Sequence, residues 1–249
     1  MTVLPTTPLQ RPLREHDVLC FVHIKKTAGS SLIHVLRSHF PRQAFTYIPT
    51  YSKSLSMTHD LYQKMQRDRI LRSHMDYNIT NKVMPRRPVF LTMLRHPLKQ
   101  FISFYGQQQK RSMLLGEGVQ DFTDFVSHSI GSKHNMQTRQ LAGTTMHPDV
   151  LSPQDMLAIA QRRLDECAFV GITEQFDESL RLLCYTFGWS PIEHYTSRNI
   201  TPAALKPEVT PELEALILEH HQLDLQLYAY ARRLFLARFQ RMQQEQQAQ

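Results

Sequence analysis

Cysteine is scarce in this chain of 249 residues, and the three cysteines, Cys20, Cys167 and Cys184, are widely scattered. Their odd number and wide spacing exclude a disulfide framework, and they form none of the close cysteine pairs that bind zinc. Each cysteine has apolar neighbours in the sequence, which predicts buried free thiols in a protein of a reducing, cytoplasmic environment.

Long apolar runs are missing as well. No stretch reaches 18 consecutive apolar residues, so we expect no transmembrane segment. The first 17 residues include Pro5, Pro8 and Pro12 but no apolar core, so we expect a tail there and no signal peptide. Hydrophobic residues make up 41% of the chain and charged residues 20%, a composition that excludes general disorder.

Acidic residues are scarce in the first half of the chain. Residues 1–112 carry 18 lysines and arginines against 5 acidic residues, whereas residues 113–249 carry 11 against 17. The formal net charge of +7 therefore combines a strongly basic half with a mildly acidic one. This asymmetry predicts that the first half binds an anion.

Apolar runs typical of strands buried on both faces alternate with segments of helical periodicity. The predicted strands cover residues 18–24, 70–74, 89–94 and 169–173. The predicted helices cover residues 32–40, 59–69, 97–110, 121–129, 135–141, 153–167, 176–187 and 211–242, and irregular structure is expected over 42–58 and 76–88. The alternation predicts an α/β fold whose central parallel sheet has helices on both faces, with a P-loop-like phosphate-binding loop after the first strand.

No internal repeat and no clear linker divides the sequence. We therefore expect one domain over residues 18–242, between an N-terminal tail (1–17) and a frayed Gln-rich tail (243–249). Ligands of parallel sheets bind beyond the carboxyl ends of the strands. The predicted strand ends hold Lys25, Lys26, His74 and Arg95.

The segment after the first predicted strand combines cations, hydroxyls and a helix start. Residues 25–31 read Lys-Lys-Thr-Ala-Gly-Ser-Ser, and a helix N-terminus offers phosphate its free N–H groups and its dipole. The lysines precede the glycine, unlike the lysine of the G-x-x-x-x-G-K-[ST] loop of nucleotide triphosphatases. His74 and Arg95 at the other strand ends supply a base and a cation instead of carboxylates for Mg²⁺, so a metal-free anionic donor fits better.

A second candidate anion site begins where the predicted strand 89–94 ends. Arg95 offers a planar guanidinium, and Ser103 offers a neutral donor about two helical turns further on. Taken alone, this pair is equally compatible with a surface arginine and a serine on a helix face.

Together these segments resemble the PAPS-dependent sulfotransferases, above all the carbohydrate type that includes heparan sulfate 2-O- and 6-O-sulfotransferases. Residues 23–31 are similar to the family's H-I-P-K-T-A-G-T-S loop, and Arg95 with Ser103 is similar to its site for the 3′-phosphate of PAPS. Residues 135–143, 169–174 and 224–231 carry weaker similarities.

The resemblance implies PAPS as the co-substrate, PAP as the product and no metal ion. Lys26 matches the lysine that contacts the 5′-phosphate and the oxygen bridging to the sulfuryl group, while Arg95 and Ser103 would hold the 3′-phosphate. The residues expected around the 5′-phosphate are Lys25, Lys26, Thr27, Ala28, Gly29, Ser30 and Ser31. Lys25 replaces the usual proline and Ser30 the usual threonine, so either lysine can contact the leaving group, with Lys26 favoured by the match.

The proton of the acceptor hydroxyl needs a base. His74 stands in a segment that resembles the family's G-H-x-x-Y, with Ser73 in place of the glycine, and an imidazole with a pKa near ~6.5 suits this role. His23, His96 and Asp76 remain rival candidates.

Asn135 and Arg139 are further candidates to line the cleft, unless they belong to a capped, solvated helix. The sequence thus predicts a cytoplasmic sulfotransferase that moves a sulfuryl group from PAPS to an acceptor hydroxyl by in-line displacement. A carbohydrate is the favoured acceptor, an acidic glycan would suit the basic half, and a lipid or a tyrosine peptide stays open. A Mg²⁺-dependent nucleotide kinase and a non-catalytic polyanion-binding module are the alternatives, and nucleic acid is not expected as a partner.

Overall fold

The computed structural model describes residues 9–48, 59–74, 76–82, 87–118, 120–145, 148–192, 194–195, 202 and 205–248. Its centre is a five-stranded sheet made of β1 (Val18–Val22), β2 (Phe45–Ile48), β3 (Ile70–Ser73), β4 (Pro88–Leu94) and β5 (Phe169–Ile172). The strands are parallel and follow the order β2-β3-β1-β4-β5. The predicted α/β class is therefore confirmed. Strands β2 and β3 lie on one side of β1 and strands β4 and β5 on the other, so the strand order reverses at β1. Ligands of such sheets usually bind beyond the carboxyl end of the strand where the order reverses.

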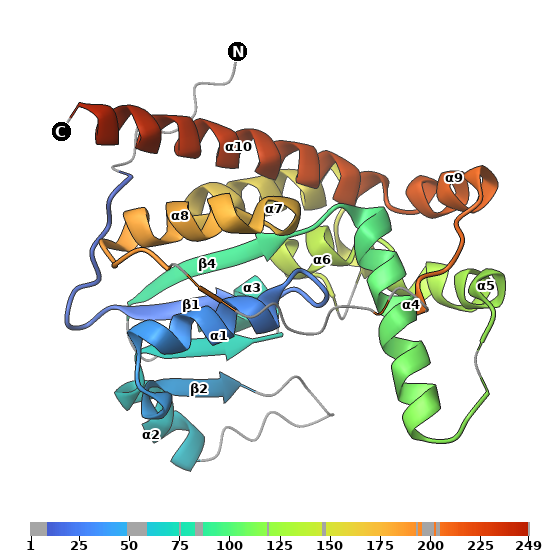
Figure 1. Cartoon of the computed structure of the whole chain (residues 1–249), viewed down its shortest axis with the longest axis horizontal. Helices are drawn as coiled ribbons and strands as arrows, with labels where there is room; N and C mark the ends of the chain where they lie inside the picture. Colours follow the sequence, from blue (N-terminus) through green and yellow to red (C-terminus); the bar gives the residue numbers. More distant parts are fainter. Residues whose placement is uncertain are drawn as a thin grey trace.

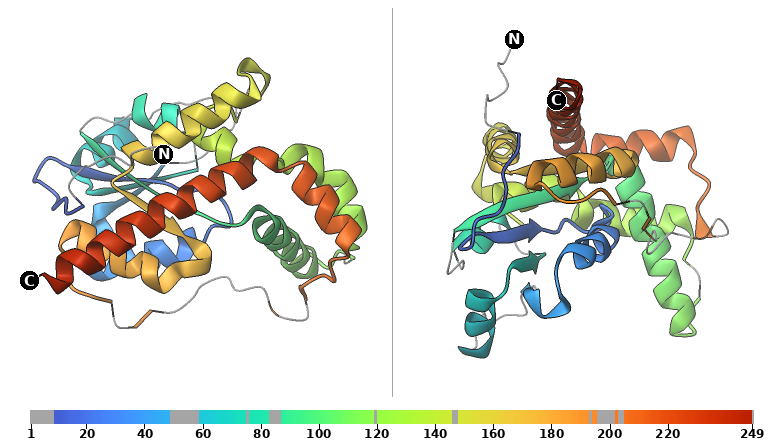
Figure 2. Two further views of the ribbon diagram at one scale, coloured as in Figure 1. Left: turned by 90° about the horizontal axis from the view of Figure 1, so that it is seen from above. Right: turned by 60° about the vertical axis from the view of Figure 1, so that its left-hand side comes forward.

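Helices cover both faces of this sheet (Figures 1 and 2). One face carries α1 (Gly29–His39) and α8 (Phe176–Phe187). The other face carries α3 (Tyr77–Lys82), α6 (Met136–Ala142) and α7 (Pro153–Glu166). The long helix α10 (Gln222–Gln247) runs between α7 and α8 along the β5 edge, and α2 (His59–Arg67) packs beside β2.

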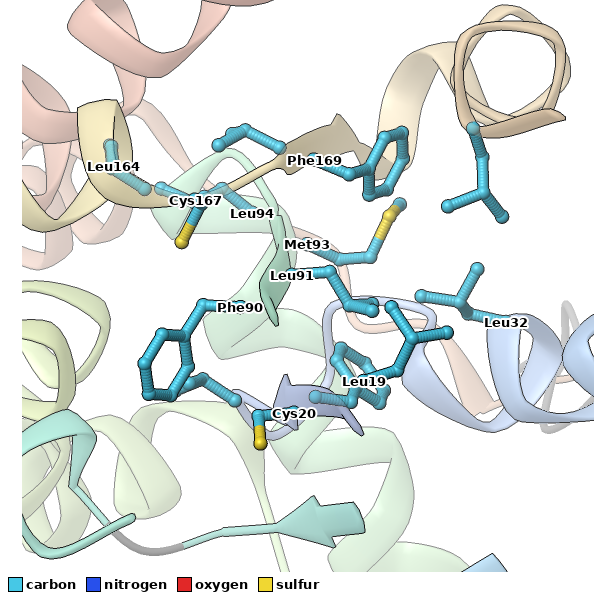
Figure 3. Packing of buried hydrophobic residues seen from close by; sticks show 14 of the residues in the cluster. Leu19, Cys20, Leu32, Phe90, Leu91, Met93, Leu94, Leu164, Cys167 and Phe169 are labelled. Carbon is cyan, nitrogen blue, oxygen red and sulfur yellow. The ribbon is translucent and has the colours of Figure 1, made fainter. Parts of the chain in front are cut away.

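The core fills both faces of the sheet because successive strand residues point to opposite sides. Figure 3 shows Leu19 and Cys20 of β1 on opposite sides, with Leu19 toward Leu32 of α1. All residues of β1 are fully buried, and burying each large apolar side chain contributes about 1.5–3 kcal/mol. The three cysteines are free and buried, as their apolar neighbours predicted.

A second apolar cluster lies beside the sheet, in what we call the side lobe. It consists of α4 (Pro97–Leu114), α5 (Phe122–Lys133) and α9 (Pro211–Glu219), which lie together on the right of Figure 1. Phe101 of α4 packs against Phe125 of α5 with ring centroids 5.2 Å apart, and Ile217 of α9 completes the cluster. None of the helices in the described part of the chain is both long and apolar enough to cross a membrane.

The structure corrects several sequence-based boundaries. Residues 42–58 were expected to be irregular, but Phe45–Ile48 forms the edge strand β2, a short segment in which the polar Thr46 interrupts the apolar run that signals a buried strand. The predicted loop 76–88 contains the short helix α3. The single helix expected over 211–242 is divided at His220 and His221 into α9 and α10, and α10 continues past 242 to Gln247.

Candidate active site

A cleft of about 1160 Å³ opens at the carboxyl ends of β1, β3 and β4, facing the side lobe. It brings together most of the residues that the sequence selected from distant segments. The predicted residues that line it are His23, Lys25, Lys26, Ala28, Gly29, Ser30, Ser31, His74, Arg95 and Ser103. The predicted phosphate loop, the predicted 3′-phosphate pair and the favoured base therefore share one cavity.

The loop from β1 to α1 has a backbone suited to an anion. Lys26 (φ 67°) and Ala28 (φ 61°) adopt left-handed conformations on either side of Thr27, and α1 begins directly after them at Gly29. Alternating backbone conformations of this kind turn successive N–H groups toward one concave side, and the first N–H groups of a helix lack partners inside it. The loop therefore offers an anion several backbone donors.

Hydrogen bonds from three directions fix this loop. Gln100 of α4 donates its side-chain amide to the Lys25 carbonyl (2.8 Å), and Arg95 donates to the Lys26 carbonyl (3.2 Å). The Thr27 hydroxyl donates to the Ile24 carbonyl at 2.9 Å, and the Thr27 side chain is fully buried. Thr27 was expected to surround the donor phosphate, but its hydroxyl is used inside the loop and its side chain does not line the cleft.

Gly29 is the residue that lets the loop close over the sheet. A Cβ atom on Gly29 would lie 2.0 Å from Nε2 of His23, so any side chain here would displace that imidazole. The His23 ring stacks on Phe21, with centroids 4.9 Å apart, and burial lowers the pKa of His23 to about 2. His23 is therefore a neutral ring packed beneath the loop, which argues against it as the base.

Of the two loop lysines, Lys26 is the more buried. Lys25 is exposed, whereas Lys26 is half-buried. Burial, followed by the positive charges of Arg95 and Lys110, lowers the pKa of Lys26 to about 8. An anion bound beside Lys26 would relieve this repulsion, so the loop is electrostatically prepared for a phosphate.

Arg95 is held by its backbone rather than by a charged partner. The side-chain amide of Gln137, fully buried in α6, accepts from the Arg95 N–H (3.1 Å) and donates to the Arg95 carbonyl (2.8 Å). The guanidinium reaches the cleft, where its buried Nε has no hydrogen-bond partner in the described part of the chain. A buried donor of this kind is costly without an acceptor, which fits an anionic ligand at this position.

A fully buried carboxylate supports Gln137 from behind. Asp224 of α10 accepts from the N–H of Gln137 (3.1 Å), from the N–H of Thr138 (2.7 Å) and from the Thr138 hydroxyl (2.6 Å). In return, Oδ1 of Asn135 accepts from the N–H groups of Leu223 (3.0 Å) and Asp224 (3.1 Å). The starts of α6 and α10 thus cap each other, and this pair supports the turn at Arg95.

Asn135 and Arg139 do not line the cleft, contrary to one of the two sequence interpretations. The Asn135 side chain is occupied by the start of α10, as described above. Arg139 donates to the Thr145 carbonyl at 2.9 Å, outside the cleft. Their part of the chain acts on the site indirectly, through Gln137.

The residue after Arg95 is held in a similar way. Glu174 accepts from the His96 N–H (3.1 Å) and from the Tyr228 hydroxyl (3.0 Å), and the Tyr228 ring lies edge-on to the His96 ring with centroids 5.5 Å apart. The weak sequence similarities around 135–143, 169–174 and 224–231 therefore meet at one place, the turn after β4. Sequence reasoning assigned no role to Gln137, Glu174 or Asp224, and only those weak similarities pointed to them.

Among the candidate bases, His96 and Asp76 lie away from the cleft lining. The Asp76 carboxylate is buried and accepts from the Thr145 N–H (3.2 Å) and the Thr145 hydroxyl, and burial raises the pKa of Asp76. The His96 ring packs on Tyr228. Of the four candidates, His74 alone combines a place in the cleft with a ring that does not lie beneath the loop.

The hydrogen bonds of His74 define its protonation state. Its Nδ1 lies 2.6 Å from the His23 carbonyl oxygen, and because a carbonyl only accepts, Nδ1 carries the ring proton. Burial, together with the charges of Arg72 and Lys25 and against the effect of that hydrogen bond, lowers the pKa of His74 to about 4. The ring is neutral near pH 7, and its Nε2 has a lone pair that can accept a proton.

Positive charge dominates the whole cleft. The lysines and arginines that line it are Lys25, Lys26, Arg72, Arg95, Lys99, Arg111, Lys133 and Lys206. Glu117 is the one carboxylate among the described residues of the lining. This excess supports both an anionic donor and an anionic acceptor.

Comparison with known proteins places the chain in a family. The model of the sulfotransferase family matches residues 13–231. The chain is similar to heparan-sulfate 6-O-sulfotransferase 2 of Danio rerio, with 27% identity over 94% of this chain and 61% of that protein. It is also similar to heparan-sulfate 6-O-sulfotransferase 1 of Homo sapiens, with 25% identity over 95% of this chain and 71% of that protein. The chain thus spans about three fifths of the length of the Danio rerio relative.

A solved structure gives a weaker likeness. A mouse sulfotransferase crystallised with PAP matches with a TM-score of 0.48 and 13% identity, over 89% of this chain and 92% of that one. The family match itself extends over far more than half of the sequence and includes the phosphate loop, Arg95 and Ser103. The chain therefore belongs to the sulfotransferase family, as the resemblance of its donor-site segments indicated.

Proposed function

We propose that this protein transfers a sulfuryl group from PAPS to a hydroxyl of a carbohydrate, with PAP as the second product. One observation carries the proposal: the loop over residues 25–31, Arg95, Ser103 and His74 meet in one cleft at the sheet edge. The family match and the heparan-sulfate 6-O-sulfotransferase relatives support the same reaction and a sugar acceptor.

The fit of the donor rests on two anion positions. The backbone N–H groups at the start of α1, with Lys26, would hold the 5′-phosphate, and Arg95 with Ser103 would hold the 3′-phosphate. The buried, unpartnered Nε of Arg95 in the described part of the chain supports the second position. The donor supplies the activated sulfuryl group, and Lys26 stabilises the negative charge that grows on the leaving phosphate oxygen.

His74 would act on the other reactant. The acceptor oxygen forms a bond to sulfur while the bond between sulfur and the phosphate oxygen breaks, and the acceptor proton passes to Nε2 of His74. The neutral ring and its protonated Nδ1 support this assignment. Fixing both reactants in one cleft supplies the positional part of the rate enhancement.

A transfer assay with His74→Ala tests the assignment. Turnover should fall by about 10²–10⁴-fold, the range for a lost general base, while PAP binding measured by thermal shift stays unchanged. His128→Ala removes an exposed histidine of α5 and serves as the matched control. Full activity of the His74 variant would exclude His74 as the base.

The reaction itself is tested on the unmodified protein. Stabilisation by PAP but not by ATP with Mg²⁺, and labelled sulfate on a heparan-sulfate-type oligosaccharide, are the expected results. Turnover of ATP with Mg²⁺ and no use of PAPS would instead favour the kinase alternative.

A further inference from the structure

Arg72 is a cleft residue that the donor site and the proposed base leave without a role. Arg72 lies on β3, one residue before the end of that strand and on the other side of β1 from Arg95. Its register neighbour on β1 is Phe21. Its guanidinium is half-buried and lies 5.3 Å from the centroid of the Tyr47 ring on β2. No ion pair joins Arg72 to a carboxylate among the residues that the structure describes.

Two imidazoles occupy the donors of this guanidinium instead. Nε of Arg72 donates to Nδ1 of His23 at 2.9 Å, which leaves the His23 proton on Nε2 beneath Gly29. One Nη group of Arg72 lies 3.4 Å from Nε2 of His74, a long and weak contact. This is the nitrogen that must be free to accept the acceptor proton.

From this arrangement we infer that one Nη group of Arg72 covers Nε2 of His74 until a carboxylate of the acceptor binds that Nη group instead. The inference rests on the proposed function and specifies the acceptor as a carboxylate-bearing sugar. A half-buried arginine without a carboxylate partner binds an entering carboxylate well, because its planar donors match the two carboxylate oxygens. The weak 3.4 Å contact is the one that this exchange gives up, whereas the bond to His23 keeps the side chain in place.

The charged and titratable groups around His74 come from several elements. Arg72 belongs to β3, His23 and Lys25 follow β1, and the Tyr47 ring of β2 lies 6.2 Å from the His74 ring. Arg72 and Lys25 both lower the pKa of His74. Removing the Arg72 charge should therefore raise that pKa, whereas a lysine at this position keeps the charge and should not.

The test compares two acceptors. One is a heparan-sulfate-type oligosaccharide with its carboxylates intact, and the other is the same oligosaccharide after reduction of the carboxylates to alcohols. The wild-type chain should favour the intact acceptor in kcat/KM by about 10-fold to 100-fold, the range of one charge-assisted hydrogen bond.

Arg72→Met keeps most of the aliphatic stem and removes the charge. Its kcat/KM should fall with the intact acceptor and rise with the reduced one, so that the ratio drops to within about 3-fold. The acid limb of its pH profile, and the His74 titration followed by NMR, should both move to higher pH. Arg72→Lys keeps the charge but not the planar donors, so it should keep the acid limb and lose part of the preference.

Arg37→Met is the matched control, since it removes an exposed guanidinium whose charge acts on Arg72 but which does not line the cleft. It should leave the acceptor ratio unchanged. Retention of the wild-type ratio and acid limb in a folded Arg72→Met protein would overturn the inference. If the wild-type chain transfers sulfate to neither acceptor, the proposed function fails first, and this result differs from an active wild type with an indifferent Arg72 variant.

Discussion

Arg95 follows β4 and Arg72 lies one residue before the end of β3, on opposite sides of β1. Both face the same cleft, but different kinds of contact hold their side chains. The backbone of Arg95 is bound on both its N–H and its carbonyl by Gln137, and Asp224 supports Gln137 in turn. The backbone of Arg72 is held in β3 between β1 and β2, and its guanidinium is placed by one hydrogen bond to His23 and by the ring of Tyr47. The proposed donor side of the cleft is therefore fixed around the backbone of Arg95, while on the proposed acceptor side the guanidinium of Arg72 rests on contacts that a ligand can exchange.

The sharpest test of the donor side is Lys26→Met. If Lys26 stabilises the leaving group, turnover should fall by about 10²–10³-fold with every acceptor, equivalent to about 2.7–4 kcal/mol of transition-state stabilisation. Lys25→Met is the control, because Lys25 is exposed at the neighbouring position. A larger loss in the Lys25 variant would reverse the assignment of the two lysines.

The support behind the donor side is broken by Asp224→Ala. This change leaves the donors of Gln137 and Thr138 without an acceptor in the protein interior, so unfolding should need about 3 kcal/mol less free energy. PAP affinity should fall as well, because the Arg95 turn loses its support. Chemical denaturation and a PAP titration measure the two effects.

Gln226→Ala, an exposed position of the same helix, is the control for Asp224→Ala. Full PAP affinity in a destabilised but folded Asp224 variant would show that the two helix starts support stability only.

Arg95→Ala removes the guanidinium that is proposed to bind the 3′-phosphate of the donor. Loss of a charge-assisted contact should weaken PAP binding by about 1.5–3 kcal/mol, or about 10-fold to 150-fold, as measured by calorimetry. The same experiment with Arg72→Met should leave PAP affinity nearly unchanged, because Arg72 is proposed to bind the acceptor and not the donor. Equal losses in both variants would erase the distinction between the two sides.

The smallest expected effect is that of mild acid on the wild-type chain. The base must be neutral, and the pKa of His74 is lowered to about 4, so protonation removes activity only as the pH falls through that value. Between pH 7 and pH 5.5, kcat/KM should change by less than about twofold, whereas an imidazole with the ordinary pKa near ~6.5 would lose about tenfold. A tenfold loss over this interval would show that the surroundings do not hold the His74 pKa down.

The sequence predicted the parts of this molecule that depend on local pattern. Continuous apolar runs marked β1, β4 and β5. The helices predicted to begin at 153 and 211 do begin there as α7 and α9, where the hydroxyls of Ser152 and Thr210 cap them. The edge strand β2 was missed because it is only four residues long and the polar Thr46 interrupts its apolar pattern. The alternation of strands and helices sufficed for the fold class.

The sequence could not predict contacts between distant segments. Arg72 meets His23 because β1 and β3 pair in one register, and nothing local to Arg72 signals this contact. Gln137 and Asp224 are 87 positions apart and meet only through the packing of α6 on α10. Most residues proposed to bind the donor were visible as motifs, whereas those that hold the motifs in place came from the fold.

The mutual capping of α6 and α10 also has a consequence for how the chain matures during synthesis. Every residue proposed to touch the donor has left the ribosome once Ser103 has emerged, yet the carboxylate that supports the Arg95 turn follows only at Asp224. A nascent chain that ends before α10 contains the phosphate loop but lacks the Asp224 carboxylate that supports the Arg95 turn. The protein should therefore acquire its donor site late, and a truncated product of translation would not compete with the finished enzyme for PAPS.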